Sequence, residues 1–337
     1  MPILYRRLIF ITLLLTVVVI VLGAYTRLSD AGLGCPDWPG CYGHLTVPEQ
    51  VTDPQYDRPL EARKAWIEMI HRYVASSLGL LILAIFFLTL RHKQQLHQSL
   101  VLPSLLVVVV IFQGLLGMWT VTKLLSPVVV TAHLLGGLTT LSLLWLLWLS
   151  QERKAKANYQ PLQTQAFSGL RAMALVVLLL VIGQIFLGGW TSTHYAAVAC
   201  GVSFPECHGE LWPPADFAEG FSIHMQDNVD YQYGILGNPA RTAIHLSHRA
   251  GALVVFLVVG GFSLWLWLKR RVLVGFLPIW MIAMLLLQLS LGIMNVVLAL
   301  PLGVAVAHTA GAAILLLMMI KLNEQLAYPP IELAAQR

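Results

Sequence analysis

The chain has 337 residues, of which 58% are hydrophobic and only 11% are charged. Soluble domains carry roughly 25% charged residues, so this composition excludes an ordinary soluble protein and predicts an integral membrane protein. The formal net charge of +5 requires no nucleic-acid partner, because Lys and Arg residues beside membrane helices account for it.

Apolar segments follow one another along the chain, and each is long enough to cross a bilayer, which takes about 20 helical residues. We expect an all-α fold with eight transmembrane helices, near residues 8–26, 66–90, 101–121, 127–149, 170–190, 242–268, 272–297 and 302–321. The first segment has a long apolar core and no evident small-residue cleavage site, which favours a retained span over a secretory signal.

Basic residues gather at alternate ends of these segments. Four clusters fall on one side of the membrane if the N-terminus is cytoplasmic: Arg6/Arg7, Arg91/Lys93, Arg153/Lys154/Lys156 and Lys269/Arg270/Arg271. Cytoplasmic loops carry an excess of Lys and Arg. Both termini are therefore predicted to be cytoplasmic, and two long loops, about 27–65 and 191–241, are predicted to lie outside.

The second half of the chain repeats the layout of the first. GAYTRLSDAGLGC at 23–35 matches GGWTSTHYAAVAC at 188–200, and EMIHRYVA at 68–75 is echoed by HLSHRAGA at 245–252. Parallel duplication of membrane bundles often places a site in each half or between them. We expect two pseudo-symmetric four-helix halves with a cytoplasmic linker and tail, at 1–150, 169–325, 151–168 and 326–337, respectively.

Four histidines occupy equivalent places in the predicted halves. They lie at a common depth of about 7–10 Å below the outer surface, and they are His71, His133, His248 and His308. One such histidine could be a packing residue, but four at one depth indicate a site, since intramembrane ionisable groups are costly. Zinc usually takes more protein ligands, whereas heme iron takes two axial imidazoles. The pattern therefore predicts a heme in each half.

Small residues follow three of these histidines by three and four positions, on the same helical face. They are Gly136 and Gly137, Gly251 and Ala252, and Gly311 and Ala312. We interpret them as room for a flat macrocycle to approach the backbone. The alternative is that small residues only let membrane helices pack closely.

The two predicted sites differ at one position. Glu68 lies three residues before His71, whereas His245 occupies the matching place in the second half. A carboxylate beside a bound heme can stabilise positive charge or take a proton, so the N-terminal site is predicted to be the reactive one. The alternative is an interfacial acid at a helix N-terminus. Arg72 and Arg249 are expected either to contact heme propionates or to extend to lipid headgroups.

All four cysteines lie in the predicted outer loops. Cys35 and Cys41 flank PDWPG, and Cys200 and Cys207 flank GVSFPE. These spacings match neither zinc sites nor the motif for covalent heme, so disulfides are expected on an oxidising face. Whether they are structural or form a redox relay stays open. Four loop histidines are interpreted as solvated surface residues: His44, His194, His208 and His224.

Taken together, several motifs resemble those of the heme A synthase family. They are GAYTRLSDAGLGCPDWPGC, EMIHR, TAHLLGG, HLSHR and AHTAGA, within a match from about residue 7 to 322. The resemblance implies a multi-pass protein of the bacterial inner membrane. It also implies an oxidoreductase acting on a CH group, which oxidises the ring D methyl of heme O to the formyl group of heme A with oxygen from water, for terminal oxidases.

The resemblance also implies roles for individual residues. His71 and His133 would hold the substrate heme O, His248 and His308 would ligate a heme b cofactor, and Glu68 would be catalytic. The two cysteine pairs, Cys35–Cys41 and Cys200–Cys207, match loop pairs found in members of the family.

Two other functions stay open at this stage: a bis-His cytochrome b that passes electrons across the membrane, and a heme carrier that releases its cargo unmodified. The spans contain no pair of Gly/Pro-broken helices near mid-membrane, which argues against transport. The expected partners are the bilayer, heme O synthase and a membrane electron donor or acceptor. The sequence does not decide whether the protein is a homo-oligomer.

Overall fold

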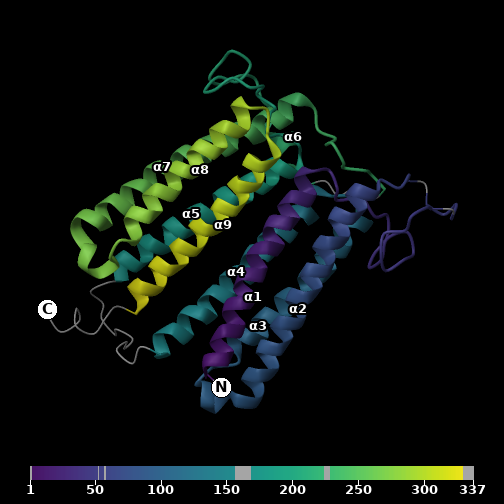
Figure 1. Ribbon diagram of the computed structural model, residues 1–337. Helices are drawn as coiled ribbons and strands as arrows, with labels where there is room; N and C mark the ends of the chain where they lie inside the picture. Colours follow the sequence, from purple (N-terminus) through teal and green to yellow (C-terminus); the bar gives the residue numbers. More distant parts are fainter. Residues whose placement is uncertain (1, 52, 57, 156–167, 224–227, 329–337) are drawn as a thin grey trace.

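The structure is a computed structural model that describes residues 2–51, 53–56, 58–155, 168–223 and 228–328. These residues form helices joined by loops (Figure 1). In chain order the helices are α1 (Pro2–Leu28), α2 (Ala62–Leu96), α3 (Val101–Thr122), α4 (Pro127–Ala155), α5 (Ser168–Thr193), α6 (Phe217–Gly220), α7 (Asn238–Val274), α8 (Leu277–Val297) and α9 (Leu302–Ala327).

Eight of the helices, all except α6, are long and apolar enough to cross a membrane. The predicted all-α fold with eight spans is therefore confirmed. The short α6 was not predicted. It forms in the long loop between α5 and α7, where the Asp216 carboxylate caps it by accepting a hydrogen bond from the Glu219 amide at 2.9 Å.

Some helix bounds differ from those predicted. Both α2 and α7 begin four residues before the hydropathy pattern suggested, at Ala62 and Asn238, and both continue past a kinked residue at their far end, His92 or Arg270. These extra turns contain polar residues, which a hydropathy window excludes. α4 reaches Ala155, so the predicted linker begins with helical residues, while residues 156–167 and 329–337 lie outside the described part of the chain.

The same helix contacts occur in the two halves of the chain. α1 packs on α2 and α4, and α3 packs on α4; α5 packs on α7 and α9, and α8 packs on α9. The halves meet where α1 contacts α9 and where α4 contacts both α5 and α9 (Figure 1). α1, α4, α5 and α9 therefore form the centre of the molecule, and α2, α3, α7 and α8 lie outside them.

Apolar and polar contacts both hold the two halves together. Leu141, Leu144 and Leu316 are buried in the cluster that includes α4 and α9, and the Trp145 indole N–H donates to the Leu317 carbonyl at 3.0 Å. Near the predicted cytoplasmic ends, Arg153 of α4 pairs with Glu324 of α9 at 2.5 Å. Close packing and interhelical hydrogen bonds are the interactions that associate helices in lipid.

The two long loops that are predicted to lie outside also contact each other. Arg58 of the first loop pairs with Asp230 and donates to the Gln232 side chain of the second. Arg27, at the end of α1, donates to the Ser192 carbonyl at 2.6 Å, and its guanidinium lies 4.1 Å from the centre of the Tyr195 ring. Contacts in the loops and at the ends of the spans thus reinforce the interface between the halves.

The interpretation of His194 as a solvated residue is wrong. The residue follows α5 directly, is only 7% exposed, and packs its ring 4.3 Å from that of Trp190. Its Nδ1 lies 3.0 Å from the Trp190 carbonyl oxygen. His44 and His208 are exposed, as predicted, and His224 lies outside the described residues.

We expect His194 to make the fold sensitive to acid. Burial lowers the pKa of His194, and only the Trp190 hydrogen bond opposes this. The unfolded chain takes up this proton near pH 6.5, so stability is lost as the pH falls below that value. When the pH of detergent-solubilised protein is lowered from about 7 to about 5, the Tm of His194→Gln should decrease less than the Tm of the parent. Equal losses in the two proteins would contradict this.

Candidate functional site

The four predicted histidines come together as two pairs within the spans. His71 of α2 and His133 of α4 have ring centroids 6.5 Å apart and an interplanar angle of 85°. His248 of α7 and His308 of α9 have ring centroids 6.5 Å apart and an angle of 90°. Each half therefore contains one pair of facing imidazoles with nearly identical geometry.

A glycine on the neighbouring helix backs each imidazole. A Cβ atom at Gly23 of α1 would lie 3.0 Å from His71 Cε1, and one at Gly188 of α5 would lie 3.2 Å from His248 Cε1. Gly117 of α3 and Gly292 of α8 stand in the same way behind His133 and His308, at 3.5 and 3.4 Å. The absence of a side chain at these glycines leaves room for each ring beside the neighbouring helix.

Three of the small residues after the histidines differ from the sequence interpretation, because side chains cover them. Glutamine side chains, rather than a space for a macrocycle, cover three of these glycines. A Cβ at Gly136 would overlap the Gln113 amide, and one at Gly311 would overlap the Gln288 amide. Gly251 faces Gln184 in the same manner. The glycines therefore admit polar side chains between the helices.

The donor set suits a metal that needs only two protein ligands. No group of three or more His, Cys, Asp or Glu side chains able to hold a metal occurs among the described residues. A metal–nitrogen bond of about 2 Å, plus about 1.1 Å from that nitrogen to the ring centroid, puts two imidazoles on either side of one metal roughly 6 Å apart.

The observed ring separation of 6.5 Å is close to this value. In addition, the buried Nδ1 atoms of His71, His133 and His308 have no hydrogen-bond partner among the described residues. Two axial imidazoles are the ligand set that a bis-His heme takes from a protein. Both pairs therefore fit a heme better than a bare ion.

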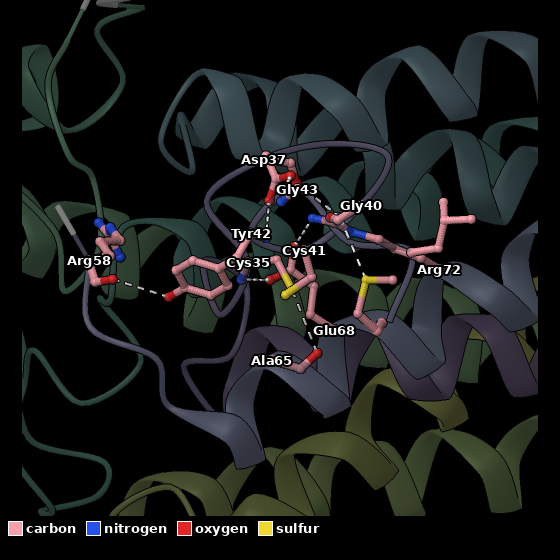
Figure 2. Close-up of a disulfide and its surroundings, with 12 residues drawn as sticks. Cys35, Asp37, Gly40, Cys41, Tyr42, Gly43, Arg58, Ala65, Glu68 and Arg72 are labelled. Carbon is pink, nitrogen blue, oxygen red and sulfur yellow. Dashed lines mark hydrogen bonds and ion pairs between the residues drawn. A yellow bond between two sulfur atoms is a disulfide. The ribbon is translucent and has the colours of Figure 1, made fainter. Parts of the chain in front are cut away.

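Glu68 is buried beneath the first disulfide loop, as Figure 2 shows. Its Oε2 accepts a hydrogen bond from the Cys35 amide at 2.9 Å, and its other oxygen pairs with Arg72, one helical turn further along α2. The residue is only 4% exposed. It is thus a fixed, buried acid on the helix that carries His71, which differs from a wet interfacial acid.

The two predicted disulfides are present. Cys35–Cys41 and Cys200–Cys207 have Cα atoms 4.8 and 4.4 Å apart. Each closes a short loop whose backbone carbonyl groups bind the arginine that follows a paired histidine. Arg72 donates to the Asp37 and Gly40 carbonyls at 3.0 and 2.5 Å (Figure 2).

The second loop repeats this arrangement. Arg249 donates to the Pro205 and Glu206 carbonyls at 3.2 and 3.1 Å. The structure thus places both arginines against loop carbonyls, rather than leaving them free for the propionate or lipid contacts expected from the sequence. The disulfide loops are thereby tied to the helices that carry His71 and His248.

His245 takes the place of Glu68 in the second half. It is 3% exposed, and its Nε2 accepts a hydrogen bond from Arg249 Nε at 3.2 Å. The acid–arginine ion pair of the first half is therefore replaced by an imidazole–arginine hydrogen bond. Only the first half has a carboxylate within hydrogen-bonding reach of this arginine among the described residues.

Comparison with known proteins identifies relatives that are named for heme chemistry. A family model described as cytochrome oxidase assembly protein (COX15-CtaA) matches residues 6–320. The chain is 46% identical to the heme A synthase of Shewanella oneidensis over 93% of this chain and 94% of that protein. It is 28% identical to the heme A synthases of Bradyrhizobium diazoefficiens, over 93% and 89% of the two chains, and of a Caulobacter strain, over 91% of each.

Proposed function

Because the chain belongs to the COX15-CtaA family of cytochrome oxidase assembly proteins, we infer that it is a heme A synthase, which converts heme O to heme A for terminal oxidases. The observation that carries this inference is the 46% identity to a heme A synthase along nearly the whole of both chains. With its eight spans, the enzyme is a multi-pass protein of the bacterial inner membrane.

We propose that the two histidine pairs have different occupants. The pair His71 and His133 holds the substrate heme O, and the pair His248 and His308 holds a resident heme b. When bound, heme b would supply a one-electron carrier inside the protein. The position of Glu68 supports this assignment of the two hemes. A residue that accepts or donates protons is useful beside a reacting substrate, and Glu68 lies on the helix that carries His71.

Glu68 is proposed to be the catalytic acid–base residue. Oxidation of a methyl to a formyl group with oxygen from water removes four electrons and four protons. A membrane electron carrier accepts the electrons, and Glu68 accepts protons from the reacting carbon and from water. The Cys35 amide and the Arg72 guanidinium hold the carboxylate in one orientation, which removes the need for reorganisation during the reaction.

The function is tested by expressing the protein in a host that makes heme O but not heme A. Chromatography of the extracted hemes should then show heme A. Extraction of heme b alone would favour a bis-His electron-transfer protein, and extraction of unchanged heme O would favour a heme carrier. Either of these results would overturn the proposed function.

The glycines behind the imidazoles provide a second prediction. In Gly188→Ala the new methyl group would lie 3.2 Å from His248 Cε1, and contacts this short force one of the two groups to shift. We expect weaker heme b binding and an altered low-spin spectrum in the purified protein. Gly183→Ala on the same helix is the matched control, because no atom lies within 4 Å of its added Cβ. Equal spectra for both variants would contradict the prediction.

The proposed partners follow from the reaction. Heme O is an apolar substrate, so the enzyme that makes it, heme O synthase, is the proposed supplier within the bilayer. The electron acceptor is proposed to be a carrier in the same membrane. The homo-oligomer considered from the sequence is not required by either histidine pair, since both pairs are complete within one chain.

A further inference from the structure

The helix that backs His248 contacts this residue twice. Gly188 of α5 lies behind the imidazole, and Gln184, one turn earlier on the same face, extends its amide to it. The Gln184 Nε2 lies 3.0 Å from His248 Nδ1 and 3.0 Å from the His248 backbone oxygen. Gly251, which has no side chain, makes room for this amide.

The first half lacks this contact. In the repeat, α1 corresponds to α5, and Gly23 behind His71 corresponds to Gly188. The position one turn before Gly23 is Val19, and the position three residues after His71 is Val74. Two valines thus replace Gln184 and Gly251, and within the described part of the chain the buried Nδ1 of His71 has no hydrogen-bond partner.

The other ligand of each pair shows no such difference. Gln113 lies over Gly136 in the first half, and Gln288 lies over Gly311 in the second. In the part of the chain that the structure describes, neither amide nitrogen has a hydrogen-bond partner, and neither do the Nδ1 atoms of His133 and His308. Among the paired histidines, the halves therefore differ in whether a glutamine side chain contacts the imidazole Nδ1: one does at His248, and none of the described residues does at His71.

A histidine that binds a metal through one ring nitrogen carries a proton on the other and donates it to an acceptor, which fixes the ring and its tautomer. An amide can present either its nitrogen or its oxygen, because the two ends have the same shape. In the structure the Gln184 nitrogen donates to the His248 backbone oxygen. When His248 carries its proton on Nδ1, the amide turns over and gives up this bond, and the Gln184 oxygen, which lies over Gly251 and has no partner among the described residues, becomes the acceptor. Its nitrogen then lies over glycine, as the nitrogens of Gln113 and Gln288 do.

We propose that Gln184 is a positioning residue that makes the C-terminal site retain its heme, whereas Val19 and Val74 leave the N-terminal site able to exchange its heme. This deepens the proposed function and rests on it. An enzyme that binds heme O and releases heme A needs one site from which heme departs, and a resident cofactor needs one from which it does not. The hydrogen bond between Gln184 and His248 is the proposed reason why one site retains its heme and the other exchanges it.

The test measures the release of heme b from purified full-length protein to excess apomyoglobin, with heme identity assigned by chromatography. Gln184→Val copies the first half and should accelerate release by roughly tenfold or more, the usual effect of removing such a partner. The midpoint potential of heme b should rise, because the ligand loses electron density. Gln288→Val is the matched control, since its amide also covers a glycine but contacts no imidazole nitrogen.

The reciprocal variant Val19→Gln/Val74→Gly transfers the glutamine and its space to the first half. It should slow the release of heme from the N-terminal site by a similar factor and reduce turnover, because product leaves more slowly. Parental release rates in both Gln184→Val and the reciprocal variant would overturn the proposal, as would equal acceleration by Gln288→Val. Failure of the proposed function would look different, because the parent protein would then form no heme A.

Discussion

Replacing Glu68 with glutamine is expected to lower the conversion of heme O to heme A by roughly 10²–10⁴-fold, the usual contribution of a positioned acid–base group. Glutamine has the same shape, and its oxygen can still accept the Cys35 hydrogen bond that Glu68 Oε2 accepts at 2.9 Å. It cannot take a proton or carry a negative charge. Heme b content should stay at the parental level, so the loss appears in turnover, measured by chromatography of extracted hemes.

Glu61→Gln is the matched control for this variant. Glu61 precedes α2 on the same side of the protein, is exposed, and forms an ion pair with Lys64. Alkylation of free thiols before and after reduction should show that Cys35–Cys41 is intact in both variants. Parental conversion by Glu68→Gln would remove Glu68 from the mechanism and leave it as an anchor for the disulfide loop.

Replacing His248 with alanine should remove the resident heme, with occupancy falling more than about tenfold. The pair His248–His308 supplies both protein ligands at that site, and no third metal-binding side chain joins them in the described part of the chain. The low-spin bands of the purified protein should therefore disappear. His308→Ala should behave in the same way.

His71→Ala provides the contrast within the same protein. It removes one ligand of the first pair, so heme b bands should persist while heme A formation stops. His44→Ala, a change at an exposed loop residue, should affect neither property. Persistent low-spin bands in both His248→Ala and His308→Ala would show that the heme is held elsewhere.

The sequence was sufficient to predict the spans, and it also singled out candidate site residues. Hydropathy reports how each segment partitions between water and lipid, which is a local property. The four histidines and Glu68 could be found because ionisable groups are rare and costly within spans. The repeat also related them to one another, so that the replacement of Glu68 by His245 could be recognised in the linear chain.

The contacts around these residues could not be predicted from the sequence. Burial of His194, binding of Arg72 by loop carbonyls, and the glutamines over Gly136 and Gly311 each join residues that are far apart in the chain or on different helices. Such contacts depend on the rotation and spacing of helices, and these are set by close packing rather than by hydropathy.

The sequence by itself therefore determined a membrane protein with eight helices, two related halves and five candidate site residues, because composition, helix length and repeats are properties of the linear chain. The tertiary structure decided which helix backs each imidazole, that Cys35 and Arg72 fix Glu68, and that Gln184 supports His248 while His71 has no such partner. These contacts form only when α1 packs on α2 and α5 packs on α7. The helix that packs against a side chain determines which residues that side chain contacts.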